Sequence, residues 1–337
     1  MINPCELTRT LIDRESFSNN EQEAASFLFD FLSPMALPYS GRVERMDVGD
    51  GRFNVFACWG DPIVTLSTHM DTVPPFIPSR EDHEHIWGRG ACDAKGIISA
   101  MIAAAEQLLL RAVRNFGLLF VVGEERDSAG AKAAARNPRG ARYLINGEPT
   151  ENLLALGSKG ALRYELAAQG KMAHSAYPEL GRSAIEALLD VLQDLRRIPL
   201  PEDPLLGRGT MNIGTIAGGR APNVIADAAC AEVMIRLVGD ADPVREAFTA
   251  AVAGRVDVKE VLHVPLARLG RIVGFPTTVV SYTTDIPFLA GAWGEPFLVG
   301  PGTIHVAHTA EERIPKKQLM EAVEIYSTMT ERLLQRV

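Results

Sequence analysis

The sequence lacks several features that would assign it to a common class of protein. It contains no stretch of 18 apolar residues, so we expect no membrane-spanning helix. The N-terminus has no basic segment followed by an apolar one, so we expect no signal peptide. Dense runs of Lys or Arg are also missing, and the net charge is −8. Membrane and nucleic-acid partners are therefore not expected.

Cysteine motifs and nucleotide-binding glycine motifs are missing as well. The four cysteines, Cys5, Cys58, Cys92 and Cys230, have no C-x-x-C spacing, which is typical of free thiols and predicts a cytoplasmic protein. Gly88-Arg89-Gly90 is followed by Ala-Cys-Asp, so the G-x-G-x-x-G pattern is incomplete, and no Walker lysine follows. A nucleotide-binding enzyme is therefore disfavoured.

The order of strand-like and helical segments predicts an α/β fold. The chain has 337 residues, of which 47% are hydrophobic, and this length favours two domains. Apolar strand-like runs alternate with helical patterns, which is typical of a mostly parallel twisted sheet flanked by helices. An amphipathic helix is expected over Lys95–Arg111, and Ser18-Asn19-Asn20 is expected to cap a helix near the N-terminus. The strands expected here are Arg42–Asp47, Arg52–Trp59, Ile63–Thr68, Phe116–Gly123 and Ala141–Asn146.

The pattern changes after Gly157 and predicts an inserted α+β domain. Two strand–helix–strand units follow one another, which is the β-α-β-β-α-β plan of a small separate domain. The α/β pattern then returns near residue 264 and closes with a helix over Lys316–Leu334. We therefore expect one discontinuous domain, residues 1–157 and 264–337, with residues 158–263 inserted into it.

Two adjacent acids end one of the predicted strands, in the run Phe120–Glu125. Glu124 and Glu125 at the end of a buried strand raise each other's pKa unless a cation is near, because like charges and desolvation both disfavour the ionised form. An exposed polar loop is the alternative interpretation. Further imidazole and carboxylate groups elsewhere in the chain favour the cation: His69, Asp71, Asp93, Glu148 and His308.

These residues can meet because ligands of open α/β sheets bind beyond the carboxyl ends of the strands. Such a donor set suits two Zn²⁺ ions, with Co²⁺ or Mn²⁺ as substitutes. The hypothesis gives one ion to His69 and Glu148 and the other to His308 and Glu125. The remaining three groups complete it: Asp93 bridges the ions, Asp71 orients His69, and Glu124 is the general base that moves a proton from water to the leaving nitrogen.

These motifs resemble the co-catalytic dizinc aminoacylase and carboxypeptidase family, which includes acetylornithine deacetylase, succinyl-diaminopimelate desuccinylase, acetyl-lysine deacetylase and glutamate carboxypeptidase. The resemblance covers essentially the whole chain and keeps the order of the motifs. It rests on Ser67–Pro74, Gly88–Gly96, Gly123–Glu125, Gly147–Thr150, Ala173–Ser175, Gly300–Gly302 and Ala307–Thr309. It implies a cis peptide bond after Asp93 and an inserted lid or dimerisation domain, through which a homodimer would form.

The resemblance also implies further site residues. His174 would stabilise the oxyanion, and Tyr177, Asn223 and Thr283 occupy positions similar to substrate contacts. His308 is preferred over His305 as a ligand because Ala307-His308-Thr309, with Glu311 downstream, fits the family.

Two arginines are candidates for a substrate carboxylate, Arg220 and Arg236, with a structural salt bridge as the alternative for each. The short span from His69 to Asp93 and the segment Gly157-Ser158-Lys159-Gly160 depart from the desuccinylase pattern. They weaken any transfer of that enzyme's specificity.

The expected function is metal-dependent hydrolysis of the amide bond of an N-acyl amino acid, such as acetylated ornithine or lysine. The substrate would be a small molecule. A dipeptidase or carboxypeptidase is the alternative, because the same site serves both reactions. A non-catalytic binding protein on the same scaffold is a further alternative, disfavoured because every ligand position and the base are filled.

Overall fold

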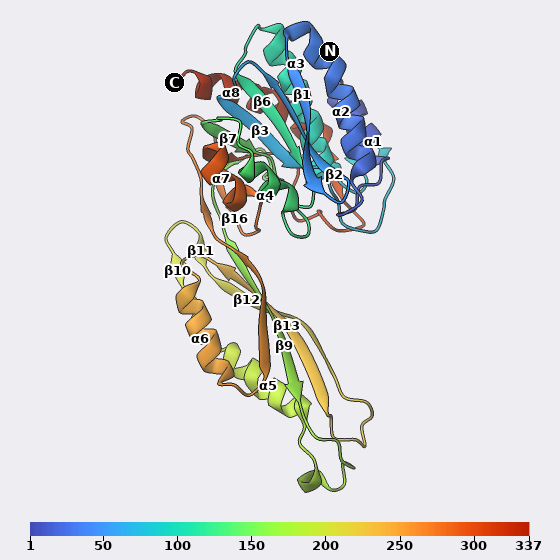
Figure 1. Ribbon diagram of the computed structural model, residues 1–337, viewed down its shortest axis with the longest axis vertical. Helices are drawn as coiled ribbons and strands as arrows, with labels where there is room; N and C mark the ends of the chain where they lie inside the picture. The colour runs from blue at the N-terminus through green and yellow to red at the C-terminus, as the bar shows by residue number, and fades with distance from the viewer. Residues whose placement is uncertain (337) are drawn as a thin grey trace. The chain divides into compact units, whose positions relative to one another are not determined.

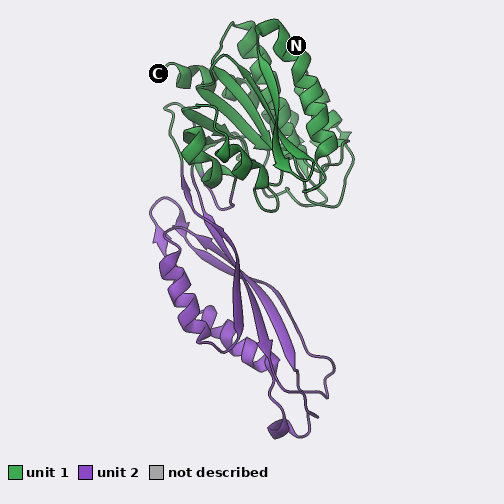
Figure 2. Ribbon diagram, in the orientation of Figure 1, with its two compact units in different colours: residues 1–156, 269–278, 284–337 green, residues 157–268, 279–283 purple. Residues whose placement is uncertain are grey.

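A mixed sheet covered by helices on both faces forms the first of two compact units in the computed structural model, which describes residues 1–336 (Figures 1 and 2). Unit 1 comprises residues 1–156, 269–278 and 284–336, and unit 2 comprises residues 157–268 and 279–283. Within the described chain, no helix combines the length and apolar character needed to cross a membrane.

The sheet of unit 1 runs in the order β1-β2-β6-β3-β7-β17-β8. Its centre is parallel, because β3 pairs in parallel with both β6 and β7, and β7 with β17. The strands are β1 (Arg42–Gly49), β2 (Arg52–Trp59), β3 (Val64–His69), β6 (Phe116–Val121), β7 (Tyr143–Asn146), β8 (Leu154–Ser158), β16 (Thr277–Val280) and β17 (Glu295–Leu298). A separate three-stranded sheet contains β4 (Arg80–Glu81), β5 (His85–Trp87) and β18 (Arg313–Pro315).

Alternate residues of the strands face two different helical layers. Val55 and Ala57 belong to a core with α1, α2, α3 and α8, whereas Phe56 and Cys58 belong to a core with α4 and α7. This period of two is what a strand buried on both faces requires. The helices are α1 (Pro4–Ile12), α2 (Gln22–Ala36), α3 (Gly96–Leu110), α4 (Ala129–Arg136), α7 (Ile286–Trp293) and α8 (Lys316–Leu334), with short turns η1 (Leu37–Tyr39) and η2 (Ala91–Lys95).

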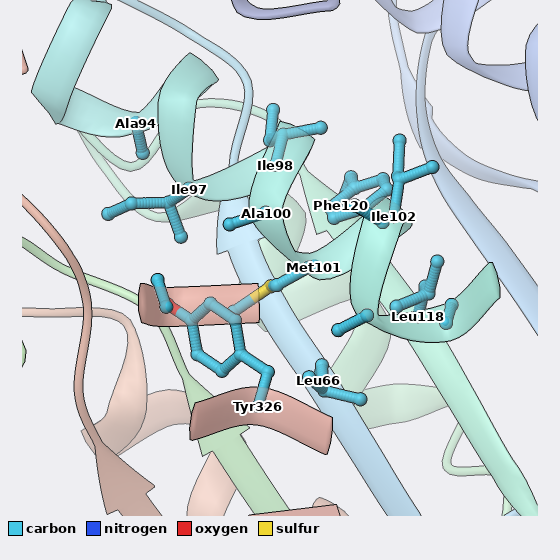
Figure 3. Packing of buried hydrophobic residues seen from close by; sticks show 14 of the residues in the cluster. Leu66, Ala94, Ile97, Ile98, Ala100, Met101, Ile102, Leu118, Phe120 and Tyr326 are labelled. Carbon is cyan, nitrogen blue, oxygen red and sulfur yellow. The ribbon is translucent and has the colours of Figure 1, made fainter. Parts of the chain in front are cut away.

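Helix α3 differs from the sequence-based prediction of an amphipathic helix. All but three of its residues are buried, because α1 and α8 pack on the side that the prediction left to solvent. Ile97 and Met101 lie beside Tyr326 of α8 in this core (Figure 3). The expected cap at Ser18–Asn20 was also wrong, since α2 begins after Glu21 without a side-chain cap.

Unit 2 is a four-stranded antiparallel sheet in the order β12-β13-β9-β14. Buried and exposed residues alternate along β9, and α5 and α6 share the core with its buried face. The elements are β9 (Gly160–Gln169), η3 (Pro178–Leu180), α5 (Ala184–Leu195), β10 (Glu202–Asp203), β11 (Gly207–Arg208), β12 (Thr210–Gly218), β13 (Ala228–Leu237), α6 (Asp242–Val252), β14 (Asp257–Val264) and β15 (Ala267–Arg268).

The predicted fold class is confirmed. The central strands of unit 1 are parallel, helices cover them on both sides, and unit 2 has the βαββαβ order expected of the inserted segment. The predicted insertion, residues 158–263, lies inside unit 2. Strand β8 was not predicted from the sequence.

Candidate active site

Three neighbouring parallel strands deliver most of the charged residues to one edge of the unit 1 sheet. His69 is the last residue of β3, Glu124 and Glu125 follow β6, and Glu148 follows β7. Because β6, β3 and β7 are adjacent and parallel, their carboxyl ends meet at the same edge. Local sequence thus fixes the strands, and sheet order brings the side chains together.

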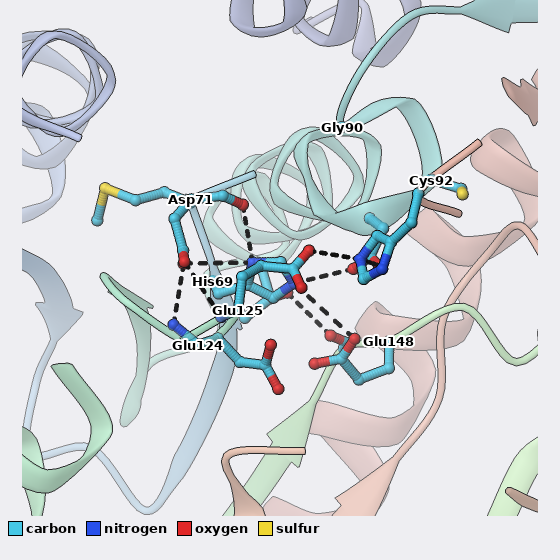
Figure 4. A network of polar contacts seen from close by, with 12 residues as sticks. His69, Asp71, Gly90, Cys92, Glu124, Glu125 and Glu148 are labelled. Carbon is cyan, nitrogen blue, oxygen red and sulfur yellow. Dashed lines mark hydrogen bonds and ion pairs between the residues drawn. The ribbon is translucent and has the colours of Figure 1, made fainter. Parts of the chain in front are cut away.

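The charged residues form two groups that share Asp93. In one group, His69 Nε2 lies 2.9 Å from Asp93 Oδ1 and 3.9 Å from Glu148 Oε2. In the other, His308 Nε2 lies 2.8 Å from Glu125 Oε1 and 3.3 Å from Asp93 Oδ2. Each oxygen of Asp93 therefore faces a different imidazole. Both groups have the composition and spacing of a metal-binding cluster (Figure 4).

Asp93 sits in a sharp turn before α3. The turn η2 is not helical at Asp93 and Ala94, and the peptide bond between them is cis, as the resemblance implies. Gly90 has φ of +88°, and a Cβ there would meet the Lys95 side chain at 2.8 Å. Only glycine fits this position without strain. The carboxylate of Asp93 is thereby presented to both imidazoles.

Asp71 holds the loops around His69 and the two adjacent glutamates. His69 Nδ1 donates to the backbone carbonyl of Asp71 at 3.0 Å, and the Asp71 Oδ1 atom lies 3.5 Å from the same nitrogen. The Asp71 carboxylate also accepts the backbone N–H groups of Glu124 and Glu125, each at 3.1 Å. These contacts fix the imidazole and the start of the glutamate loop together.

Ser18 supports Asp71, although its sequence pattern predicts a helix cap. Its hydroxyl donates to Asp71 Oδ2 at 2.7 Å instead of capping a helix. A serine near a helix start is a typical cap signal. Nothing local in the sequence indicates that a serine 53 residues away supports Asp71.

The electrostatics of the site follow from burial of many acids with two imidazoles. Carboxylate partners raise the pKa of His69 well above its ordinary value despite complete burial, and those of His308 raise its pKa to about 10. Burial raises the pKa of Glu148 well above its ordinary value. The two histidine partners overcome burial and lower the pKa of Asp93. The site thus combines buried acids with imidazoles whose pKa values those acids raise.

The donor set fits two divalent cations. Glu148 is buried, with 4% of its surface exposed, and its Oε1 atom has no hydrogen-bond partner within the described chain. A buried, unpaired carboxylate oxygen is costly unless a cation or donor reaches it. Imidazole nitrogens and carboxylate oxygens with no thiolate are typical of open catalytic zinc or manganese sites.

Glu124 belongs to neither group. Burial of its carboxyl, together with the negative charge of Glu148, raises the pKa of Glu124 well above its ordinary value. Figure 4 shows its carboxylate lying between the backbone of its own loop and Glu148. It is therefore a carboxyl group that lies beside the two groups and belongs to neither.

Three further buried residues of the site were not singled out from the sequence. Glu312 is buried, whereas the neighbouring Glu311, which the sequence motif includes, is exposed. Glu312 pairs with the buried Arg89 at 2.6 Å. Asp285, at the start of α7, is 1% exposed, and neither of its carboxylate oxygens has a hydrogen-bond partner in the described chain. Their spacing carries no periodic signal that could have found them.

His308 and His305 differ clearly in their surroundings. His308 faces Asp93 and Glu125, whereas the side chain of His305 belongs to neither metal-binding cluster of the described chain, and His305 is exposed. His308 also has φ of +63°, a left-handed conformation that costs a residue with a side chain about 1–3 kcal/mol and is common at functional sites.

The remaining candidates belong to unit 2. His174 is exposed, its Nδ1 accepts from the backbone N–H of Ala176 at 3.1 Å, and its ring lies against Tyr177. Asn223 is exposed, and Thr283 is partly buried. Their predicted roles stay predictions, because they lie outside the cluster of unit 1.

The two candidate arginines differ in their partners. Arg220 forms two hydrogen bonds with Asp227, at 2.9 and 3.0 Å, on the surface of unit 2. This is the salt bridge that was the alternative to substrate binding. Arg236 is half-buried on β13, and burial lowers its pKa.

Comparison with known proteins agrees with the fold. Residues 65–332 match the family model described as peptidase family M20/M25/M40. A probable carboxypeptidase from Aspergillus oryzae is 39% identical, over 97% of this chain and 87% of that protein. A metallo-carboxypeptidase of the M20 family from Sulfolobus solfataricus superposes with a TM-score of 0.79 at 15% identity, over 99% of both chains. A dinuclear metal-binding M20 peptidase from Bacillus subtilis gives 0.70 at 16% identity, over 99% and 98%.

The match to the family model spans most of the chain, and the Aspergillus oryzae relative is matched over 87% of its length. The likeness to the two solved structures shows the fold. Together with the two groups that share Asp93, these findings identify the chain as an enzyme that hydrolyses amide or peptide bonds, and it belongs to peptidase family M20/M25/M40.

Proposed function

We propose that unit 1 hydrolyses a linear amide bond next to a free carboxylate, using two divalent cations and Glu124 as the general base. The observation that carries the proposal is the pair of three-residue groups joined by Asp93, with Glu124 beside them and in neither. Two ions about 3.5–4 Å apart are typical of hydrolases that activate water for attack on a carbonyl. Family membership supports this reaction class.

The residues would divide the ligand work between the two groups. His69 and Glu148 would hold one ion, His308 and Glu125 the other, and Asp93 would take part in both, since one of its oxygens faces each imidazole. We propose Zn²⁺ as the resident metal, with Co²⁺ or Mn²⁺ as substitutes. When bound, the ions supply a Lewis acid for the acyl oxygen and lower the pKa of water.

Glu124 carries the proton through the reaction. Its carboxylate takes a proton from the attacking water as the water oxygen bonds to the acyl carbon. It then gives this proton to the nitrogen as the carbon–nitrogen bond breaks, so that a free amine leaves. The Asp71 carboxylate, which accepts the backbone N–H of Glu124, holds this loop in place during both transfers.

Two substrate classes meet these requirements. N-acyl amino acids, such as acetylated ornithine or lysine, and peptides cleaved at their C-terminal residue both release an amino acid with a free carboxylate. The name of the Aspergillus oryzae relative, a probable carboxypeptidase, favours the second class. We therefore propose carboxypeptidase or dipeptidase activity beside deacylation, with the leaving amino acid as the part common to both.

The experiment that tests the base is Glu124→Gln. The amide keeps the shape of the side chain but cannot accept the proton, so kcat should fall by about 10³-fold or more while two ions stay bound. Metal content by elemental analysis and kcat with a shared substrate measure the two effects. The exposed Glu295→Gln is the matched control and should leave both unchanged. Near-normal turnover of Glu124→Gln would disprove the assignment.

A second experiment separates the substrate classes. The Zn²⁺-, Co²⁺- and Mn²⁺-loaded enzyme is assayed with a matched set in which one amino acid carries either an acetyl group or another amino acid on its nitrogen. A kcat/KM at least 10-fold higher for the peptides identifies a peptidase, and the reverse identifies a deacylase. Equal absence of turnover on both sets would contradict the proposal.

The inserted unit has proposed roles of its own. A lid or a homodimer contact is proposed for it, and the outer edge of β12 supports the dimer, because β13 is its only strand partner in the described sheet. Cytoplasmic location is also proposed, and the four free cysteines support it.

A further inference from the structure

A buried ion pair lies next to the metal-binding groups but belongs to neither. Arg89 Nη1 lies 2.6 Å from Glu312 Oε2, and the two side chains are only 3% and 1% exposed. Removing both charges from water is expensive, and a buried pair often contributes little net stability. The hydrogen bonds that Arg89 and Glu312 form with other residues therefore indicate the role of the pair.

Glu312 reaches the turn that presents Asp93. Its Oε1 atom accepts the backbone N–H of Gly90 at 2.8 Å and lies 3.4 Å from the backbone nitrogen of Asp93. The backbone carbonyl of Glu312 accepts the N–H of Gly88 at 3.1 Å. One residue thus binds the turn at three successive points.

Arg89 reaches the loop that presents His308 and the loop that follows His69. Its Nη1 donates to the backbone carbonyl of Thr309 at 3.2 Å, and its Nε donates to that of Pro75 at 3.3 Å. A planar guanidinium can satisfy several acceptors in fixed directions at once, which a lysine cannot do. The Arg89 side chain therefore joins its own turn to two other segments, one beyond His69 and one beyond His308.

The His308 segment needs such support. Residues 299–312 contain no helix or strand, and His308 has φ of +63° with a side chain that is 48% exposed. A residue with a Cβ keeps this conformation only where its surroundings impose it. The contacts of Thr309 and Glu312 with Arg89 and Gly88 lie directly beyond His308 in the chain.

We infer that Arg89 and Glu312 are positioning residues that set the distance between Asp93 and His308, and so determine how tightly the ion between them is held. We call this pair the Arg89–Glu312 clamp. The inference rests on the proposed function for the identity of the ligands. It goes beyond it by assigning the affinity of one ion to two residues that do not touch it.

The test measures metal binding rather than activity. Dissociation constants for two Co²⁺ ions are obtained by competition with a chelating dye, for the wild type and for Glu312→Gln. The amide keeps only one acceptor oxygen, so its NH2 group must face either Arg89 or the backbone N–H of Gly90. The ion assigned to His308 and Glu125, identified as the one that His308→Ala weakens, should bind with a dissociation constant raised about 10–100-fold. The other ion should change less than 3-fold. Arg89→Lys, which keeps the charge but cannot span the three acceptors, should weaken the same ion.

A double-mutant cycle that combines Glu312→Gln with His308→Ala shows whether the clamp acts through His308. Glu312→Gln should add less than 3-fold to the weakening that His308→Ala causes alone, because the ligand that it positions is already gone. Full additivity of the two changes would overturn the inference.

Two controls separate positioning from loss of stability. Val323→Ala shortens a buried side chain on α8 that belongs to neither metal-binding group and forms no clamp hydrogen bond, and it should lower the melting temperature. Glu260→Gln breaks the two-bond pair with Arg245 in unit 2. Both should leave the two dissociation constants unchanged.

The outcomes distinguish this inference from the proposed function. A wild type that binds no pair of ions overturns both. A wild type that binds two ions, with Glu312→Gln and Arg89→Lys binding them equally well, overturns the clamp alone. Weakening by Val323→Ala to the same extent would also overturn it, because general destabilisation would then explain the effect.

Discussion

The two units treat acidic side chains in opposite ways. Unit 1 buries six carboxylates almost completely: Glu21, Asp71, Asp93, Glu148, Asp285 and Glu312. In the described part of unit 2 no Asp or Glu is buried to that degree, and its acids pair with arginines at the surface, as Asp227 does with Arg220 and Glu260 with Arg245. Both units have extensive apolar cores, so the contrast does not follow from a lack of core material in either.

The contrast indicates that charged side chains lower the stability of unit 1 more than that of unit 2. A surface pair costs little to form and contributes little, about 0–1 kcal/mol. A buried carboxylate is costly unless a positive group satisfies it. Asp285 and Glu148 each have an oxygen without a partner in the described chain. Unit 1 therefore has a charge imbalance that cations would correct, and unit 2 has none of this kind.

Removing the metal should have the largest effect, and this effect should fall on unit 1. Chelation is expected to abolish activity and to make unit 1 less stable as pH rises from about 5 to 7. Burial raises the pKa of Asp285 to about 7, and burial with the nearby Asp93 charge raises that of Glu312 to about 7. The folded chain then holds protons that the unfolded chain releases near pH 4, so the free energy of unfolding falls as pH rises through this window.

Calorimetry of the chelated protein at pH 5 and pH 7 measures the effect, and we expect a fall in melting temperature of about 5 °C or more. Added Zn²⁺ should remove most of the slope, because it supplies the missing positive charge. Asp285→Asn should flatten the slope in the metal-free protein. A melting temperature that is the same at both pH values would show that the buried acids are already compensated.

A substitution in unit 2 sharpens the comparison, because it should affect catalysis without affecting metal. His174→Ala is expected to lower kcat about 100-fold if the imidazole stabilises the developing oxyanion, as removal of one such donor does in other hydrolases. Metal content should stay at the wild-type value, since His174 belongs to neither metal-binding group. The exposed His83→Ala is the control. Loss of metal from His174→Ala would make it a ligand instead.

The contrast also explains what could be predicted from the sequence. Residues that end strands were found because strand periodicity is local and sheet edges collect ligands, as with His69 and Glu148. The order of the inserted elements was visible for the same reason. Helix α3 was misjudged, because its outer side is covered by α1 and α8, and that covering depends on tertiary packing that a local pattern does not contain.

Supporting residues were missed for a related physical reason. Ser18 contacts Asp71 across 53 residues, and Arg89 contacts Glu312 across 223. A serine beside a helix and an arginine in a glycine turn each have a satisfactory local explanation. Only the folded chain shows that Glu312, and not the neighbouring Glu311, turns inward.

The smallest effect is expected from Arg220. Its guanidinium already forms two hydrogen bonds with Asp227 and is 64% exposed, so Arg220→Ala removes only a surface pair. The substitution should change KM less than about 3-fold and the melting temperature by about 1 °C.

Arg236 is half-buried, and no ion pair of the described chain involves it. If either arginine binds the substrate carboxylate, Arg236→Met should therefore raise KM by more than Arg220→Ala does. Steady-state kinetics with a substrate and its carboxamide show which arginine binds the carboxylate. The wild type should prefer the carboxylate substrate, and a variant that has lost the carboxylate contact should have similar KM values for both compounds. A 10-fold rise in KM for Arg220→Ala would mean that the guanidinium leaves Asp227 and binds the substrate. The surface pair in unit 2 would then hold Arg220 in place until the substrate binds.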